Sequence, residues 1–131
     1  MKTCISVLSL ILVLAAGSAL ATAEEGKAAR GENVTISGTM TCSFCKLAHP
    51  DTPCHHACCE KCVGAGESPL LTDADGNMYL LLTGEKGAAL MNKDRLAWLG
   101  GKVTVTGVLV KGKGVQAIFV DRMQQWQEAH K

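Results

Sequence analysis

The sequence predicts a mainly β protein: a five-stranded OB-like barrel with a Cys/His-rich helical insert after the first strand and a helix between the third and fourth strands. Three observations lead to this prediction. Five segments show the alternation or the apolar content of strands. Their order, with one helical segment between the third and the fourth, is that of an OB-type barrel. A dense group of cysteines separates the first strand from the second. An open five-stranded meander is the alternative.

The first 23 residues have the pattern of a secretory signal peptide. Lys2 gives a positive start, residues 5–14 are mostly apolar, and residues 21–23 read Ala-Thr-Ala, which fits a cleavage site. A transmembrane anchor is the alternative, but the apolar run is shorter than the roughly 20 residues that a spanning helix needs. We therefore expect a periplasmic or extracellular protein with no stable membrane span after signal cleavage.

The chain after the signal peptide is expected to form one domain. Removing 23 residues from 131 leaves 108, a length that suits a single small fold. Residues 24–32 are polar and small and are expected to form a flexible lead-in. The barrel domain is expected at residues 33–123, its cysteine-rich insert at 42–66 and a polar tail at 124–131.

Charge and motifs limit the function classes. The chain has 13 basic and 12 acidic residues, and loss of Lys2 leaves 12 of each. Phosphate binding needs clustered positive charge, and no basic stripe is present, so we expect no nucleic-acid partner. No Ser-His-Asp, paired-carboxylate or phosphate-loop arrangement stands out, which favours a binding protein over an enzyme. The sequence does not indicate a protein partner.

The first three strands are predicted from alternation and from one turn. Residues 33–41 alternate between apolar and polar side chains, as in a half-buried strand. Residues 69–72 and 77–83 are apolar runs on either side of Asp73-Ala74-Asp75-Gly76. Aspartate and glycine favour a turn there, so the two runs are expected to form a hairpin.

A helix and a second hairpin complete the barrel. Residues 85–99 contain apolar residues at helical spacing, with Asn92 as a plausible N-cap and Asp94 in the first turn. Residues 102–110 and 115–122 flank a Lys-Gly-Lys-Gly turn and are the last two strands. The predicted core is made of apolar side chains from these elements: Val34, Ile36, Leu71, Tyr79, Leu81, Leu96, Val103, Val105, Val108, Ile118 and Val120.

The insert is expected to contain a helix of about ten residues, with no helix breaker from Cys54 to Val63. Thr52 is its predicted N-cap and Pro53 its first residue. At about 100° per residue, one histidine and three cysteines share a face of this helix. These residues are His55, Cys58, Cys59 and Cys62. Cys54 lies on the flank of that face and is interpreted as a small buried hydrophobe.

Two C-x-x-C pairs suggest a metal site. Cys42 and Cys45 form one pair and Cys59 and Cys62 the other, a spacing close to that of structural four-thiolate zinc sites. The block holds more thiols and imidazoles than four ligands, which would also suit Cu(I), a two-metal cluster or a different choice of four. The candidate ligands for zinc or copper are therefore Cys42, Cys45, His55, Cys58, Cys59 and Cys62.

Disulfides are the main alternative to a metal. Exported proteins form and keep disulfides, and the six cysteines of the insert allow 15 pairings that a sequence cannot distinguish. Helix cysteines could pair with Cys42 and Cys45, whereas two cysteines at i and i+4 of one helix lie too far apart. The result would be a disulfide-stapled barrel that binds a partner or a small ligand. A thioredoxin-like redox role ranks third, because no βαβ pattern surrounds the C-x-x-C pair.

The chain contains several short motifs in a fixed order. A cysteine follows the first strand, and His55, Cys58 and Cys62 form an H-x2-C-x3-C pattern. Later motifs are Gly66, Pro69-Leu70, Asp75-Gly76, Tyr79 and the segment GKVTVTG at residues 101–107. With these motifs the chain resembles a group of small exported bacterial proteins with an OB-like barrel, most of them uncharacterised.

The resemblance covers most of the chain after the signal peptide. It implies a barrel and an exported site, but no activity. It also implies that Cys58, rather than Cys59, serves as a ligand. Cys45, Cys54 and Cys59 are additional thiols that the pattern of that group does not contain.

Overall fold

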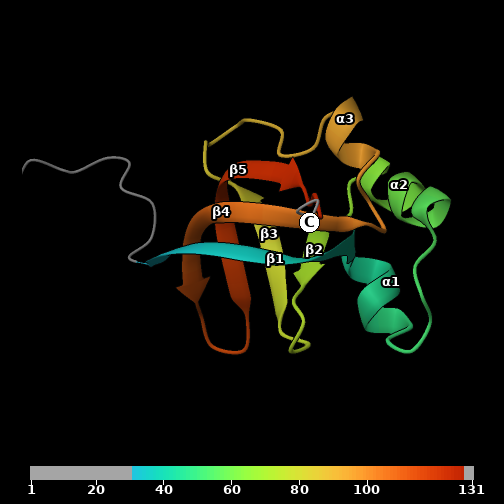
Figure 1. The fold of residues 1–131 in the computed structure, drawn as a ribbon, viewed down its shortest axis with the longest axis horizontal. Helices are drawn as coiled ribbons and strands as arrows, with labels where there is room; N and C mark the ends of the chain where they lie inside the picture. Colours follow the sequence, from blue (N-terminus) through green and yellow to red (C-terminus); the bar gives the residue numbers. More distant parts are fainter. Residues whose placement is uncertain (1–30, 129–131) are drawn as a thin grey trace, which may run out of the picture.

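The computed structural model describes residues 31–128 (Figure 1). The predicted signal peptide, nearly all of the lead-in and residues 129–131 lie outside the described residues. The described chain forms these elements: β1 (Glu32–Cys42), α1 (Ser43–Ala48), α2 (His56–Gly64), β2 (Pro69–Thr72), β3 (Met78–Thr83), α3 (Lys93–Leu96), β4 (Lys102–Lys111) and β5 (Gln116–Gln125). None of these helices is long and apolar enough to cross a bilayer.

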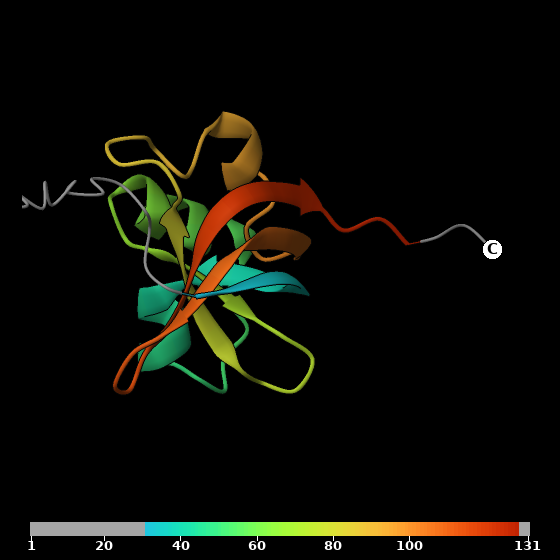
Figure 2. The same ribbon diagram turned by 90° about the vertical axis from the view of Figure 1, so that its left-hand side faces the viewer.

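The five strands form a closed barrel in the order β1-β2-β3-β5-β4 (Figure 1, Figure 2). All neighbours are antiparallel except β3 and β5, which run parallel. Strand β1 closes the barrel because Glu32 to Thr39 pairs with β4 while Thr39 to Cys42 pairs with β2. The prediction of a mainly β fold with a five-stranded barrel is confirmed, and the strand order is consistent with an OB-like arrangement.

The barrel interior is filled by alternate residues of its strands. The largest fully buried side chains include Met40, Leu71, Leu81 and Ile118. Most of the predicted core residues are buried, or partly buried and packed against the core. Val108 is an exception, since it is only half-buried.

The prediction for Val108 was wrong because it placed that residue on the wrong face of β4. Buried positions in β4 fall on Val103, Val105, Gly107 and Leu109. Gly107 lies so close to β5 that an added Cβ would be 2.1 Å from the carbonyl oxygen of Phe119. The register between β4 and β5 shifts at this point, as in a β-bulge.

The β2–β3 turn is organised by one carboxylate. Oδ1 of Asp73 accepts hydrogen bonds from the backbone N–H groups of Asp75 (3.0 Å) and Asn77 (2.8 Å). Oδ2 accepts from the Asn77 side-chain amide (2.9 Å) and the Tyr79 hydroxyl (3.0 Å). The predicted hairpin turn is therefore confirmed. These hydrogen bonds, with the Asn77 side chain first, lower the pKa of Asp73.

We expect Asp73→Asn to destabilise the protein at neutral pH but progressively less in acid. The lowered pKa means that the carboxylate stabilises the fold above the ordinary value of 3.8, and that this contribution disappears as pH falls through the folded-state pKa. Urea unfolding from pH 7 down to pH 2 checks this. Asp75→Asn is the matched control, because the Asp75 side chain makes none of these hydrogen bonds. Equal pH profiles for the two variants would contradict the prediction.

The helices gather at the end of the barrel where β1 ends and β4 begins (Figure 1). Helix α3 is shorter than the predicted helical segment, but Asn92 caps it as expected, with Oδ1 accepting from the N–H of Arg95 at 2.9 Å. Helix α1 was not predicted. Its six residues follow directly from β1, and their sequence SFCKLA contains no glycine or proline.

The prediction for the insert helix was wrong at its start. The N-cap is His55, not Thr52, and Pro53 and Cys54 lie outside α2. The reason is covalent: Cys54 forms a disulfide with Cys59. Residues five apart on one helix point about 140° away from each other, so this bond requires Cys54 to leave the helix.

Candidate metal centre

Six cysteine sulfurs meet where β1, α1 and α2 converge. Cys42 and Cys45 come from the junction of β1 and α1, Cys54 from the loop before α2, and the other three from α2 itself. Three overlapping groups of sulfurs lie mutually within 4.8 Å. The groups are Cys42-Cys54-Cys59, Cys42-Cys45-Cys62 and Cys45-Cys54-Cys58.

The change from strand β1 to helix α1 brings Cys42 and Cys45 close together. Cys42 ends β1, is fully buried and acts as the N-cap of α1, its sulfur accepting from the N–H of Cys45 at 3.3 Å. A second hydrogen bond holds the backbone at this junction. The carbonyl oxygen of Ser68, the residue before β2, accepts from the N–H of Ser43 at 2.9 Å. Both thiols are therefore fixed by backbone contacts.

Helix α2 supplies the second arm. Cys58 and Cys62 are four residues apart and share a face of the helix. The Cys58 sulfur lies 3.4 Å from the Cys45 sulfur, and Cys62 completes the group with Cys42 and Cys45. A metal–sulfur bond near 2.3 Å would put sulfurs of a tetrahedral site about 3.8 Å apart. The spacing of Cys42, Cys45 and Cys62, with Cys58 next to Cys45, is thus close to what one ion would need.

The disulfide between Cys54 and Cys59 decides which thiols remain free. Its sulfurs are 2.01 Å apart. The interpretation of Cys54 as an isolated buried hydrophobe was therefore wrong. Four cysteines of the described chain are free: Cys42, Cys45, Cys58 and Cys62. Cys59, a candidate ligand from the C-x-x-C spacing, is bonded instead, while Cys58 remains available.

The histidines lie apart from the sulfurs. His55 is the exposed N-cap residue of α2 and is not a member of the three groups. His56 has a structural contact that the sequence did not reveal: its Nδ1 lies 2.9 Å from the carbonyl oxygen of Leu99. Its Nε2 lies 3.5 Å from a carboxylate oxygen of Glu60. His56 thereby ties α2 to the turn before β4, whereas His49 ends α1 and is exposed.

Neighbouring thiols and burial raise the pKa of two of these thiols, Cys45 and Cys62. The hydrogen bond with Cys42 is the largest cause that raises the pKa of Cys45, followed by the hydrogen bond with Cys58 and by burial. Burial is the largest cause that raises the pKa of Cys62, and the contact with Cys42 adds to it. Thiolates so close together repel one another unless a cation lies between them. A bound metal would therefore displace protons from this group.

Comparisons with known proteins give no relative. No protein family, no curated protein and no solved structure matches the chain. The geometry of the sulfurs is thus the main guide to function.

Proposed function

We propose that this is an exported metal-binding protein that holds one zinc or copper ion through Cys42, Cys45, Cys58 and Cys62. One observation carries the proposal. Once the disulfide has removed Cys54 and Cys59, the free thiols of Cys42, Cys45 and Cys62 remain mutually within 4.8 Å, and the fourth, Cys58, lies 3.4 Å from Cys45. Four is the number of ligands in a closed structural zinc site.

Zinc is the first choice of metal and Cu(I) the second. Thiolates are soft ligands that select both ions, and a four-thiolate tetrahedral site is the common structural zinc arrangement. A site closed by four protein ligands leaves no position for a substrate. The proposed role is therefore to hold or deliver the metal and to link α1 to α2, and the protein is not proposed to be an enzyme.

Export is supported by the signal-peptide pattern and by chemistry. Disulfides persist outside the cytoplasm, and the chain contains one between Cys54 and Cys59. We also propose that the protein belongs with the small exported OB-like barrel proteins that its H-x2-C-x3-C motif resembles. That motif contains His55, Cys58 and Cys62, and its two cysteines are α2 cysteines that remain free here, whereas His55 belongs to none of the sulfur groups.

A disulfide-stapled barrel is the second candidate. It is supported by the Cys54–Cys59 bond and by the 3.4 Å distance between the Cys45 and Cys58 sulfurs. In that case further pairs would form within the group, and no metal would bind. The function would then be the binding of a partner or a small ligand by the barrel.

Native mass spectrometry with thiol counting separates the two candidates. The exported protein is purified without chelator and then compared before and after chelation. The metal proposal expects one bound ion, the loss of two hydrogens for one disulfide, and four thiols that react only after chelation. The loss of six hydrogens with no bound ion would overturn it and support the stapled barrel.

A further inference from the structure

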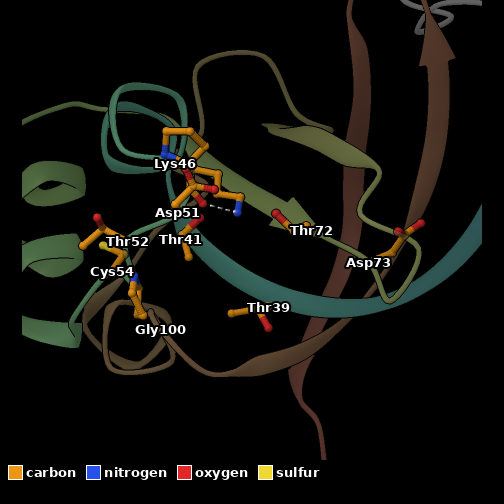
Figure 3. Close-up of a pocket in the computed structure, with 11 residues that line it drawn as sticks. Thr39, Thr41, Lys46, Asp51, Thr52, Cys54, Thr72, Asp73 and Gly100 are labelled. Atoms are coloured by element: carbon orange, nitrogen blue, oxygen red, sulfur yellow. Dashed lines mark hydrogen bonds between the residues drawn. The ribbon is translucent and has the colours of Figure 1, made fainter.

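A cavity lies on the outer side of the barrel wall, beside the disulfide (Figure 3). Its volume is about 380 Å³. The floor is formed by β1 and β2, and the loop from α1 to α2 forms a wall. The residues that matter for its chemistry are Thr41, Lys46, Asp51, Cys54, Thr72 and Asp73.

The floor of the cavity carries two buried hydroxyls without partners. Met40 and Cys42 point into the barrel, so Thr41 between them points outward beneath the loop. The Thr41 side chain is 8% exposed, and neither its Oγ1 nor that of Thr72 has a hydrogen-bond partner among the described residues. Buried hydroxyls are usually paired, since leaving one unpaired costs free energy. Both oxygens are almost completely covered, so a polar ligand that supplies their missing partners must first displace the atoms that cover them.

Charged groups of both signs surround the hydroxyls. The Lys46 ammonium donates to the carbonyl oxygen of Pro50 at 3.2 Å, which brings it to the rim of the cavity. Figure 3 shows Lys46, Thr41 and Thr72 around the same space, with Asp51 beside Lys46 and Asp73 farther along. An ammonium and two hydroxyls suit a carboxylate, and the carboxylate of Asp51 suits an amino group, whereas both oxygens of Asp73 already accept hydrogen bonds within the β2–β3 turn. A small zwitterion matches this pattern.

The cavity also reaches one end of the disulfide. Cys54 lines it and is only half-buried, whereas Cys59 is fully buried. A molecule in the cavity can therefore meet the disulfide at Cys54. We propose that the cavity binds a small aminothiol carboxylate of the cysteine type, whose thiolate attacks the Cys54 sulfur.

The exchange balances without an external oxidant. The thiolate sulfur of the ligand forms a bond to Sγ of Cys54, the Cys54–Cys59 bond breaks, and Cys59 leaves with the electron pair as a thiolate. The product is a mixed disulfide between the ligand and Cys54. A second ligand thiolate that attacks the ligand sulfur frees Cys54 and forms the symmetrical disulfide of the small thiol.

The released thiolate would act on the metal centre. The Cys59 sulfur lies within 4.8 Å of the Cys42 sulfur, so it would become a fifth thiolate next to the proposed ligands. This last step, unlike the binding and the exchange, rests on the proposed metal function. By releasing Cys59, small thiols in the surroundings would change which sulfurs are available to hold the ion. They would thereby favour either retention or transfer of the metal.

Mass spectrometry of the metal-loaded protein mixed with L-cysteine tests the inference. We expect a mass increase of one cysteine molecule, mapped to Cys54 by peptide analysis, with a rate that saturates as L-cysteine is raised. 2-Mercaptoethanol, which lacks the carboxylate and the amino group, should react without saturation. An adduct on Cys59, or equal unsaturated behaviour of both thiols, would overturn the proposal.

Two variants make the test specific to the cavity. Thr41→Val with Thr72→Val keeps the side-chain shapes but removes the hydroxyls, and should lower the rate with L-cysteine about tenfold, the effect of losing roughly one good hydrogen bond. Its rate with 2-mercaptoethanol should not change. Thr106→Val, on β4 away from the cavity, is the control and should match the wild type. An unchanged L-cysteine rate in the double variant would overturn the role of the hydroxyls and with it the proposed site.

Metal content is measured on the same samples, so the two proposals can fail separately. Saturable exchange at Cys54 in a protein that never carries metal would remove the metal function and leave the cavity inference standing. One bound ion without saturable exchange at Cys54 would remove the cavity inference and leave the metal function standing.

Discussion

Cys62→Ser is expected to abolish tight metal binding. Cys62 lies on α2 and, with Cys42 and Cys45, forms a group of sulfurs mutually within 4.8 Å. Loss of a group that only hydrogen-bonds to a metal ligand typically costs about 10–100-fold in metal affinity, so removal of a direct thiolate ligand should cost at least about 100-fold. Competition with a coloured chelator measures this change in Kd.

The same substitution should remove the stabilisation that the metal provides. At a free metal concentration of 1,000 Kd, binding to the folded state alone contributes about 4.1 kcal/mol. The wild-type free energy of unfolding should rise by about this amount when metal is added, while that of Cys62→Ser should rise very little. Urea unfolding with and without metal provides the measurement. It also reports whether the serine variant folds at all.

His55→Ala is the informative control for the ligand set. His55 shared the predicted helical face with the cysteines, but it is exposed and caps α2 without a side-chain hydrogen bond. Its replacement should leave both the Kd and the metal-dependent stabilisation unchanged. A loss of metal from His55→Ala, together with retention by Cys62→Ser, would contradict the four-thiol site.

The barrel could be predicted from the sequence because local and global signals agree. Alternation in β1 and β4 reflects one buried and one exposed face of each strand. The turn at Asp73 is stabilised by hydrogen bonds within the turn itself, so its local sequence is enough to predict it. Strand ends differ from the prediction by a few residues. The sequence did not show that Val108 points away from the core. The buried position beside it is Gly107, which has no side chain to indicate burial.

The sequence predicted that the cysteines of the insert cluster, but not which two of them form a disulfide. Cys42, Cys45 and Cys62, which the cysteine spacing grouped, lie mutually within 4.8 Å. The spacing could not reveal the bond between Cys54 and Cys59, since that bond depends on where α2 begins. The N-cap and proline signals at Thr52 and Pro53 favoured an earlier start, and the covalent link overrides them. The contact of His56 with the carbonyl oxygen of Leu99, which helps to place α2, is likewise a tertiary contact that no local pattern predicts.

Leu71→Ala is expected to cost about 2–5 kcal/mol of stability, the usual range for a buried leucine. Leu71 is fully buried in β2, and its neighbours in the sheet are Met40 on β1 and Tyr79 on β3. The substitution leaves a cavity at the centre of the closed barrel. Urea unfolding of the metal-free protein measures the loss. Leu47→Ala is the matched control, because Leu47 is 64% exposed and its replacement should change stability by no more than about 0.5 kcal/mol.

The metal response of Leu71→Ala tests whether the barrel and the metal centre are separable. All four proposed ligands lie between Cys42 and Cys62, on a segment whose thiols are held by α1, α2 and the end of β1. As long as the variant folds, the ligands keep their positions, and added metal should stabilise it by the same increment as the wild type. A much smaller increment would show that packing inside the barrel sets the geometry of the sulfurs. In that case the end of β1, where Met40 is followed by Thr41 and Cys42, would be the element that transmits the change.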